Sequence, residues 1–308
     1  MINLIARFLT ISFTTLLLVA CAGAPPNITI PATQPLTTEN IPAHPRVVLV
    51  LGGGGARGIA HAGVIEVLSK ADIPIDLIVG TSAGSIMGAL YADQGNSEQL
   101  TTLALNTSFI SLSDLNNLPK SEGLLQGYKL QKFLLNNMKA NNFNELKIPL
   151  IAITTDLKTG DVFPISSGPI APAVQASGAL PGLFDPVQLY GHTLNDGGVS
   201  DPIAVDIAQQ YKPDIIIAVN ISEQLPAALP TTAEGIYNRA YLISRINISQ
   251  MCMQGADVKI QPDVGNTGVF DTGAAKTLYA AGVTAAEQAL PQIKLLLKEK
   301  NIPLVHSN

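Results

Sequence analysis

The stretch Leu77-Ile78-Val79-Gly80-Thr81-Ser82-Ala83-Gly84 decides the fold, because it changes from strand to helix within a few residues. Its apolar beginning predicts a short buried strand, and the residues that follow it have the character of a helix. Gly80 to Gly84 fit the pattern G-x-S-x-G, in which a serine sits on a sharp strand-to-helix turn with its hydroxyl exposed. Glycines on both sides suit a strained turn that packs closely against neighbouring backbone. We therefore identify Ser82 as a candidate nucleophile.

Strands and helices alternate along the rest of the chain. The unbroken apolar run Val47–Leu51 is typical of a strand buried on both faces. Further strands are predicted at 77–80, 149–154, 161–165, 215–220 and 257–260, and helices at 59–69, after Ser82, and at 128–138, 170–177, 203–211, 236–251 and 273–300, the last with a bend at Pro291. This order predicts an α/β fold of three layers, with a mostly parallel sheet between helices. Ligands bind such sheets at the carboxyl ends of the strands.

A glycine run, Gly52-Gly53-Gly54-Gly55-Ala56-Arg57-Gly58, follows the first strand. Four consecutive glycines cost chain entropy, so the site requires backbone that no side chain obstructs. One interpretation is a dinucleotide-binding loop, but that motif expects an acidic residue near the end of the second strand, and Asp76 precedes that strand. The other is an oxyanion hole made of backbone N–H groups beside Ser82. Arg57 would then lie near the oxyanion or a substrate phosphate, or else serve as a structural arginine of the loop.

A serine nucleophile needs a base, and histidine is the usual choice. Of the four histidines, His44 lies in the proline-rich segment before the domain and His306 in the C-terminal tail, and His61 and His192 fit a helix and a hairpin turn. Asp196, in the run Asn195-Asp196-Gly197-Gly198, can sit at a strand end, and together with the glycine run and the elbow it becomes the best candidate base. An ordinary Asp-Gly turn is the alternative for this run.

The N-terminal residues indicate export. Residues 1–20 carry one cation and an apolar segment, which is typical of a secretory signal peptide. The run Leu18-Val19-Ala20-Cys21 resembles a lipobox, so we expect Cys21 to be lipidated and to anchor the chain to a membrane. Ala22 after it favours the outer membrane, with the protein facing the periplasm. The proline-rich residues 21–45 predict a tether, and residues 46–308 a single domain.

Composition narrows the possible functions. The net charge is −5 without a basic cluster, which argues against a nucleic-acid partner. The two cysteines, Cys21 and Cys252, leave no disulfide framework if the first is lipidated. No spacing of cysteine and histidine indicates a metal site, and no cofactor is expected.

Taken together, the motifs resemble those of the patatin-like phospholipases of bacteria. The glycine-rich element corresponds to Gly53–Gly58, the elbow to Gly80–Gly84 and the D-G-[GA] element to Asp196–Gly198. Residues 176–186 resemble the family's proline-bearing block, and residues 257–263 its last strand more loosely. The resemblance implies a patatin-like fold with a Ser–Asp dyad, in which Ser82 is the nucleophile and Asp196 the base. The oxyanion region it implies consists of Gly53, Gly54, Gly55 and Arg57.

The resemblance further implies a lipid acyl hydrolase of phospholipase A or lysophospholipase type, acting on phospholipid or lysophospholipid through an acyl-enzyme. Two alternatives remain open: acyl transfer or thioester cleavage by the same dyad, and a catalytically silent lipid-binding lipoprotein of the envelope. The apolar segment near Tyr128 fits a core-packing helix or a lid.

Overall fold

The computed structural model describes residues 25–35, 40–107, 110–112, 114, 122–271 and 273–305. An eight-stranded sheet lies at its centre, in the order β5-β6-β3-β2-β1-β7-β8, with β4 paired to β3. Neighbouring strands in the series β3-β2-β1-β7-β8 are parallel, whereas β4 and β6 run antiparallel to β3. The strands are β1 (Val47–Leu51), β2 (Leu77–Thr81), β3 (Leu150–Asp156), β4 (Val162–Ile165), β5 (Val187–Leu189), β6 (His192–Asp196), β7 (Ile215–Val219) and β8 (Val258–Ile260).

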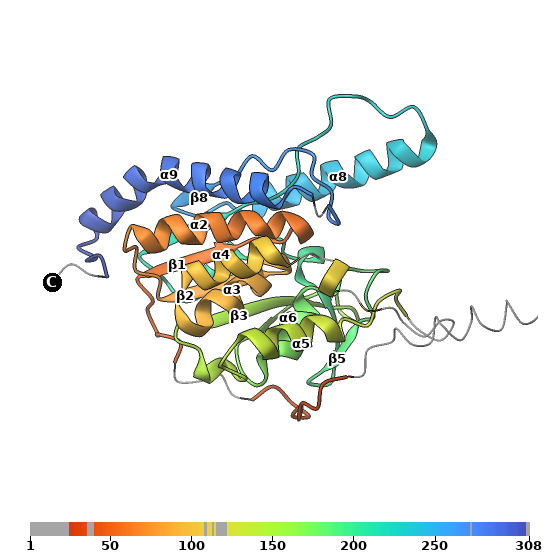
Figure 1. Ribbon diagram of the computed structural model, residues 1–308, viewed down its shortest axis with the longest axis horizontal. Helices are drawn as coiled ribbons and strands as arrows, with labels where there is room; N and C mark the ends of the chain where they lie inside the picture. Colours follow the sequence, from red (N-terminus) through yellow and green to blue (C-terminus); the bar gives the residue numbers. More distant parts are fainter. Residues whose placement is uncertain are drawn as a thin grey trace, which may run out of the picture.

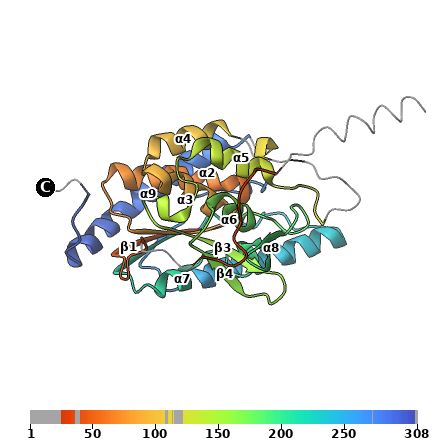
Figure 2. The same cartoon turned by 90° about the horizontal axis from the view of Figure 1, so that it is seen from below.

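Helices cover both faces of the sheet, as Figures 1 and 2 show. One face carries most of them: α2 (Ile59–Lys70), α3 (Ala83–Gln94), α4 (Ser97–Asn106), α5 (Tyr128–Asn137), α6 (Ile170–Ser177) and α9 (Ala275–Glu299). The other face is covered by the short α7 (Val205–Gln209) and by residues at the C-terminal end of the next helix, Cys252 and Met253. A further helix, α8 (Ala233–Cys252), extends away from the body of the molecule (Figure 1). The predicted three-layer α/β architecture is therefore confirmed.

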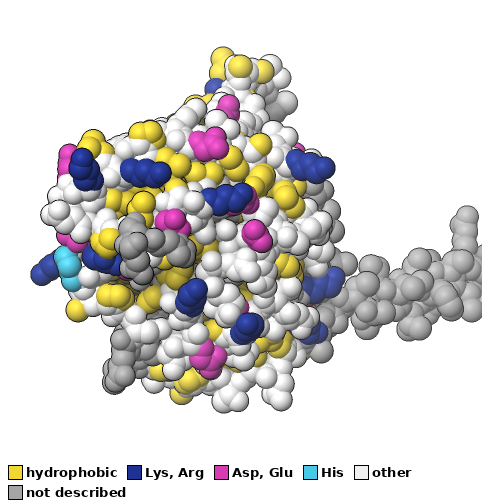
Figure 3. All heavy atoms as spheres, turned by 60° about the vertical axis from the view of Figure 1, so that its left-hand side comes forward, with side chains coloured by type: hydrophobic (Ala, Val, Ile, Leu, Met, Phe, Trp, Pro, Cys, Tyr) yellow, Lys and Arg dark blue, Asp and Glu magenta, His cyan; other side chains and the backbone are white. Residues whose placement is uncertain are grey.

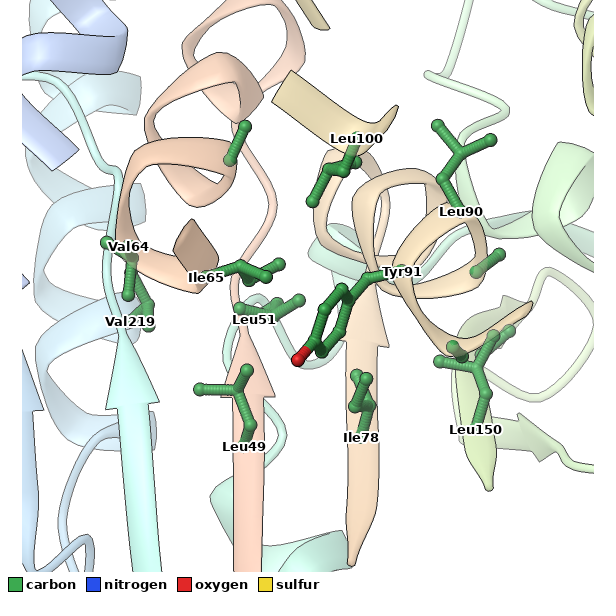
Figure 4. Packing of buried hydrophobic residues seen from close by; sticks show 14 of the residues in the cluster. Leu49, Leu51, Val64, Ile65, Ile78, Leu90, Tyr91, Leu100, Leu150 and Val219 are labelled. Carbon is green, nitrogen blue, oxygen red and sulfur yellow. The ribbon is translucent and has the colours of Figure 1, made fainter. Parts of the chain in front are cut away.

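Successive side chains of β1 point to opposite faces of the sheet, which explains why both faces must be covered by helices. Val47, Leu49 and Leu51 belong to the core on the face of the many helices, and Val48 and Val50 to the core on the other face. Figure 4 shows the first core, where side chains of β1 meet those of α2 and α3. Each fully buried aliphatic side chain stabilises the fold by roughly 1.5–3 kcal/mol. A strand without polar residues is stable only between two apolar layers.

Most strands lie within two residues of their predicted limits, because apolar runs identify buried strands well. Helix α4 was not predicted. It buries only Ser97, Leu100 and Ala104, so its apolar pattern is weak. Helix α9 continues through Pro291, although a proline removes one hydrogen bond from the helical ladder.

Part of the predicted tether lies against the domain. Ile28 and Ile41 pack on the two cores, and the Ser167 hydroxyl donates to the Pro35 carbonyl at 2.5 Å. Apolar packing and hydrogen bonding thus both hold parts of this segment on the surface of the domain. The predicted signal peptide (1–20), Cys21 and His306 lie outside the described residues. In the described ranges, no helix combines the length and hydropathy needed to cross a bilayer.

Candidate active site

Ser82 occupies the strained turn between β2 and α3. Its φ of 54° and ψ of −119° lie in a region that non-glycine residues rarely adopt. Hydrogen bonds hold the turn on both sides: the Ser82 amide donates to the Ser177 hydroxyl at 2.9 Å, and the Ser85 amide and hydroxyl donate to the Ser82 carbonyl. The turn presents the Ser82 side chain at the carboxyl end of β2, the edge where ligands bind in α/β sheets.

The elbow glycines are required by close backbone packing. A Cβ on Gly84 would lie 2.0 Å from the carbonyl oxygen of Leu51, and a Cβ on Gly80 would lie 2.7 Å from the carbonyl oxygen of Gly84. Both neighbours are backbone atoms, which cannot turn aside as a flexible side chain can. The two glycines therefore let α3 start directly against β1.

We expect Gly84→Ala to lower the free energy of unfolding by at least about 3 kcal/mol, because the methyl group would force α3 away from β1. For a domain of this size, the thermal midpoint would fall by roughly 6 °C or more. Gly268→Ala is the matched control, since its Cβ would meet no atom within 4 Å. Equal midpoints for the two variants in a thermal melt would contradict the packing argument.

Asp196 contacts Ser82 directly. The Ser82 hydroxyl donates to Oδ2 of Asp196 at 2.6 Å, and the Gly198 amide donates to Oδ1 at 2.7 Å. Asp196 is the last residue of β6, where it pairs with Thr154 of β3. The last residue of β2, Thr81, pairs with Ile153 of β3, and Asp196 pairs with the next residue of β3, Thr154. The end of β6 therefore lies level with the end of β2 across β3, which brings the carboxylate to Ser82. The two candidate residues, 114 positions apart in sequence, thus form one hydrogen-bonded pair.

Burial changes the acidity of this carboxyl. Asp196 is almost fully buried, and burial raises its pKa to about 6. The hydrogen bonds from Ser82 and Gly198 and the charge of Arg245 oppose this shift, because each stabilises the carboxylate. A carboxylate with this pKa is a stronger base than an exposed aspartate and is still ionised at neutral pH.

Neither central histidine lies beside Ser82. His61 is buried in α2, where Nε2 bonds the Gly52 carbonyl at 2.8 Å, and burial lowers its pKa to about 4. It therefore remains neutral and braces the glycine loop. His192 begins β6 and bonds Asp156 at 2.6 Å, at the opposite end of the strand from Asp196. Neither lines the cleft that contains Ser82.

The glycine loop lies against Ser82, with Gly53 in closest contact. A Cβ on Gly53 would lie 3.2 Å from Cβ of Ser82. The Gly53 N–H, however, donates to the Pro202 carbonyl at 3.0 Å. The N–H groups of Gly54 and Gly55 have no acceptor among the described residues, and both glycines line the cleft with Ser82. The free donors are thus Gly54 and Gly55, not all three glycines of the expected set.

Arg57 points away from the cleft. Its buried guanidinium donates to the carbonyls of Ile221 and Thr267 and to the Glu223 carboxylate, at 2.9–3.1 Å. Of the two roles considered for this residue, the contacts fit the structural one. The side chain ties the glycine loop to the segment after β7, because the acceptors of its hydrogen bonds lie there and in the loop near Thr267.

The cation that does line the cleft is Arg245, from α8. The cleft measures about 670 Å³, part of which is open to solvent, and Arg245 and Asp196 are the charged side chains in its wall. The Arg245 guanidinium lies 5.9 Å from the centroid of the Tyr241 ring, one turn earlier in the helix, and 3.9 Å from a Glu223 oxygen. The sequence carries no signal for this residue, since it belongs to no motif and its position depends on the path of α8.

An apolar pocket of about 820 Å³, partly open to solvent, adjoins the cleft at Gly55, which lines both. Ala83, directly after Ser82, also lines it. Its walls come from α3, α4 and α5 and include Ile86, Met87, Leu90, Leu103 and Phe133. Helix α5, the predicted Tyr128 segment, buries Leu130 and Leu134 in the core, as expected of a core-packing helix.

No cluster of side chains among the described residues could hold a metal ion.

Comparison with known proteins identifies the family of the chain. Residues 49–208 match the family model of the patatin-like phospholipases. An uncharacterized NTE family protein of Mycobacterium tuberculosis is 34% identical over 186 residues, which cover 59% of this chain and 51% of that protein. The lysophospholipase nte1 of Aspergillus fumigatus is 28% identical over 298 residues, 84% of this chain and 19% of the fungal protein. The chain thus spans about half or less of these curated relatives.

Among solved structures, VipD from Legionella pneumophila matches with a TM-score of 0.54 at 15% identity, over 87% of this chain and 70% of VipD. This similarity is one of fold. The family model, by contrast, spans more than half of the chain and contains the glycine loop, Ser82 and Asp196. The chain therefore belongs to the patatin-like phospholipase family.

Proposed function

We propose that this protein is a serine acyl-ester hydrolase of phospholipase A or lysophospholipase type. The observation that carries the proposal is the 2.6 Å hydrogen bond from Ser82 to Asp196 in a cleft that adjoins an apolar pocket. The family of the chain and the lysophospholipase among its relatives support a lipid substrate.

The dyad performs the reaction in two steps. The Ser82 oxygen attacks the ester carbonyl carbon while Asp196 takes its proton, and the N–H groups of Gly54 and Gly55 stabilise the oxyanion. The bond to the leaving alcohol breaks, Asp196 returns the proton to that oxygen, and an acyl-enzyme remains. Water then attacks the acyl carbon, Asp196 again taking the proton, and the fatty acid leaves with Ser82 restored.

The apolar pocket supplies the place for the acyl chain. It begins at Gly55 and Ala83, next to the reacting oxygen, and its walls are aliphatic and aromatic. Burying each CH₂ group of a substrate there would contribute about 0.8 kcal/mol. This arrangement favours esters of long-chain fatty acids over short, polar ones.

Activity should increase with pH up to the pKa of Asp196. The base must be ionised to accept the proton, so kcat/KM on a monomeric ester is expected to rise with pH below about 6 and to level off above it. The measurement is a pH–rate profile from pH 4.5 to 9. A plateau that continues down to pH 4.5 would argue against a buried aspartate as the base.

Arg245 should bind the phosphate of a phospholipid. We expect Arg245→Gln to lower kcat/KM on lysophospholipid by about 10- to 100-fold, because a hydrogen bond to a charged group contributes roughly 1.5–3 kcal/mol. On an uncharged monoacylglycerol, the same variant should show a far smaller fall in kcat/KM. Rates are compared at pH 8, since Arg245 also lowers the pKa of Asp196.

Arg239→Gln is the matched control for this variant. Arg239 lies on the same helix, but its guanidinium donates to the carbonyls of Pro226 and Ala228 instead of lining the cleft. Equal losses on the charged and the uncharged ester in Arg245→Gln would exclude phosphate recognition.

The whole proposal is tested by incubating the purified chain with mixed phospholipids and identifying the products by mass spectrometry, with Ser82→Ala as blank. Free fatty acid and the deacylated phospholipid, absent from the blank, are expected. Acyl transfer would instead yield a new ester when an acceptor alcohol is added. No product in either case would favour a lipid-binding protein without activity.

We also propose that a lipidated Cys21 anchors the enzyme to the envelope, on the periplasmic side of the outer membrane, where such substrates occur. This rests on the residues before Cys21, since two or more acyl chains suffice for stable anchoring.

A further inference from the structure

Helix α8 is almost unburied along its length. Of its 20 residues, Ser249 is the buried one, and it lies near the C-terminal end of the helix. Figures 1 and 2 show the N-terminal part of α8 extending beyond the sheet and its covering helices. A helix of this length in water is usually stabilised by packing one face on a core. The N-terminal part of α8 has no such core beneath it.

The same segment concentrates the exposed apolar side chains of the protein. Among the described residues, fifteen large hydrophobic side chains are exposed, and eight of these lie between residues 225 and 251. Six belong to α8 itself, and we call them the apolar arc: Ile236, Tyr237, Tyr241, Ile243, Ile248 and Met251. At 100° per residue, these six fall within roughly 160° of the helix circumference. They form one face and are not scattered.

This face borders the mouth of the active-site cleft. Tyr241 both lines the cleft and remains 59% exposed, and Arg245, one turn on, lines it too. Val199, which also lines the cleft, is exposed as well. A surface that covered the apolar arc would therefore meet the opening through which a substrate reaches Ser82.

The charged residues of α8 have a small positive excess. The helix carries Arg239 and Arg245 against the single acid Glu234, although the whole chain has a net charge of −5. Figure 3 shows basic side chains spread singly over the face that it presents, with no cluster. The combination of an apolar face, tyrosines and flanking arginines is typical of helices that lie in a membrane interface.

We propose that α8, through its apolar arc, docks the enzyme on a lipid surface and holds the cleft mouth against it. The substrate would then enter from the lipid phase directly, without passing through water. A protein partner on the same arc would cover Tyr241 and close the cleft mouth, whereas a lipid layer supplies the molecule that the cleft receives. The inference goes beyond the proposed hydrolysis but takes its lipid substrate from it.

The absence of tryptophan from the chain gives a direct test. Tyr237, 72% exposed on the arc, is replaced by Trp in the full chain, and the matched control carries Leu295→Trp on the exposed side of α9. Both changes are made in Ser82→Ala protein, so that the readout requires no hydrolysis. The proteins are mixed with vesicles of phosphatidylcholine and phosphatidylglycerol, with and without bromine on the acyl chains.

We expect the fluorescence of Tyr237→Trp to shift to shorter wavelength and to fall by roughly half or more on brominated vesicles, because interfacial helices bury their apolar face about 5–10 Å into the bilayer. Leu295→Trp should show neither change, even if an N-terminal lipid holds both proteins on the vesicle. Unquenched Tyr237→Trp in protein that sediments with the vesicles would overturn the proposal. Ile243→Trp repeats the test at a second position on the arc.

Two further results keep the inference separate from the proposed function. If Tyr237→Trp is quenched but the wild-type chain hydrolyses no ester, the docking proposal would be supported and the proposed hydrolase function would be contradicted. A dimer that dissociates on Tyr237→Glu in sedimentation velocity, together with unquenched Tyr237→Trp, would assign the arc to a second copy of the chain and overturn the docking.

Discussion

Ser82→Ala is expected to abolish ester hydrolysis, with a fall in kcat of at least about 10⁴-fold, because the acyl-enzyme cannot form without the hydroxyl. The variant should fold, since Ser82 lies in a cleft and its backbone hydrogen bonds to Ser177 and Ser85 do not involve the hydroxyl. Release of fatty acid from a monomeric ester, followed by titration, measures the loss.

Ser85→Ala is the control for a missing hydroxyl in the same turn. The Ser85 hydroxyl donates to the Ser82 carbonyl and does not line the cleft, so its removal should change kcat by less than about tenfold. If Ser82→Ala retained activity comparable to that of Ser85→Ala, a different group would have to be the nucleophile.

Asp196→Asn is expected to lower kcat by about 10⁴-fold, because an amide cannot accept the serine proton. The same change should stabilise the protein at pH 8. The amide oxygen can accept from the Gly198 N–H and its NH₂ group can donate to Ser82, so both contacts of the carboxylate keep a partner.

The expected gain in the free energy of unfolding follows from the pKa of Asp196. Burial raises the pKa in the folded protein to about 6, above the value of about 3.9 in an unfolded chain. Ionisation therefore opposes folding: the penalty is absent below pH 4, appears between pH 4 and 6, and is complete above pH 6 at on the order of 3 kcal/mol. Asparagine carries no such penalty.

Thermal melts of Asp196→Asn and the wild-type chain at pH 4 and pH 8 measure this difference. The variant should melt higher at pH 8, and the two midpoints should converge at pH 4. Asp161→Asn, at an exposed position after β3, controls for the loss of a carboxylate elsewhere. A variant that is less stable than the wild-type chain at pH 8 would show that the charge of Asp196 is not a cost to folding.

Local sequence patterns were sufficient to predict six of the eight strands and to select Ser82 and Asp196 as candidate catalytic residues, whereas the bounds of β5 and β6 were not predicted. The run at 47–51 has one stable environment, a doubly covered strand, and the elbow around Ser82 needs its own glycines within two positions. Asp196 was predicted through the glycines that follow it. The antiparallel approach of β6 is a property of the sheet and could not be derived from that run.

Features that depend on distant segments could not be predicted. The N–H groups of the glycine loop meet acceptors from distant segments: the Pro202 carbonyl accepts that of Gly53, while those of Gly54 and Gly55 have no acceptor among the described residues. Arg57 and Arg245 illustrate the same limit. The first belongs to the glycine-loop motif but donates to the carbonyls of Ile221 and Thr267, and the second reaches the cleft from a helix that no motif marks.

Labelling with a fluorophosphonate tests the central claim most directly, because this reagent forms a stable covalent bond with a serine that an adjacent base activates. The full chain is treated, digested and mapped by mass spectrometry, with Asp196→Asn treated in parallel. We predict one adduct, on Ser82, and little or none in the variant. An adduct on another residue, or no adduct on the wild-type chain, would contradict the Ser82–Asp196 dyad.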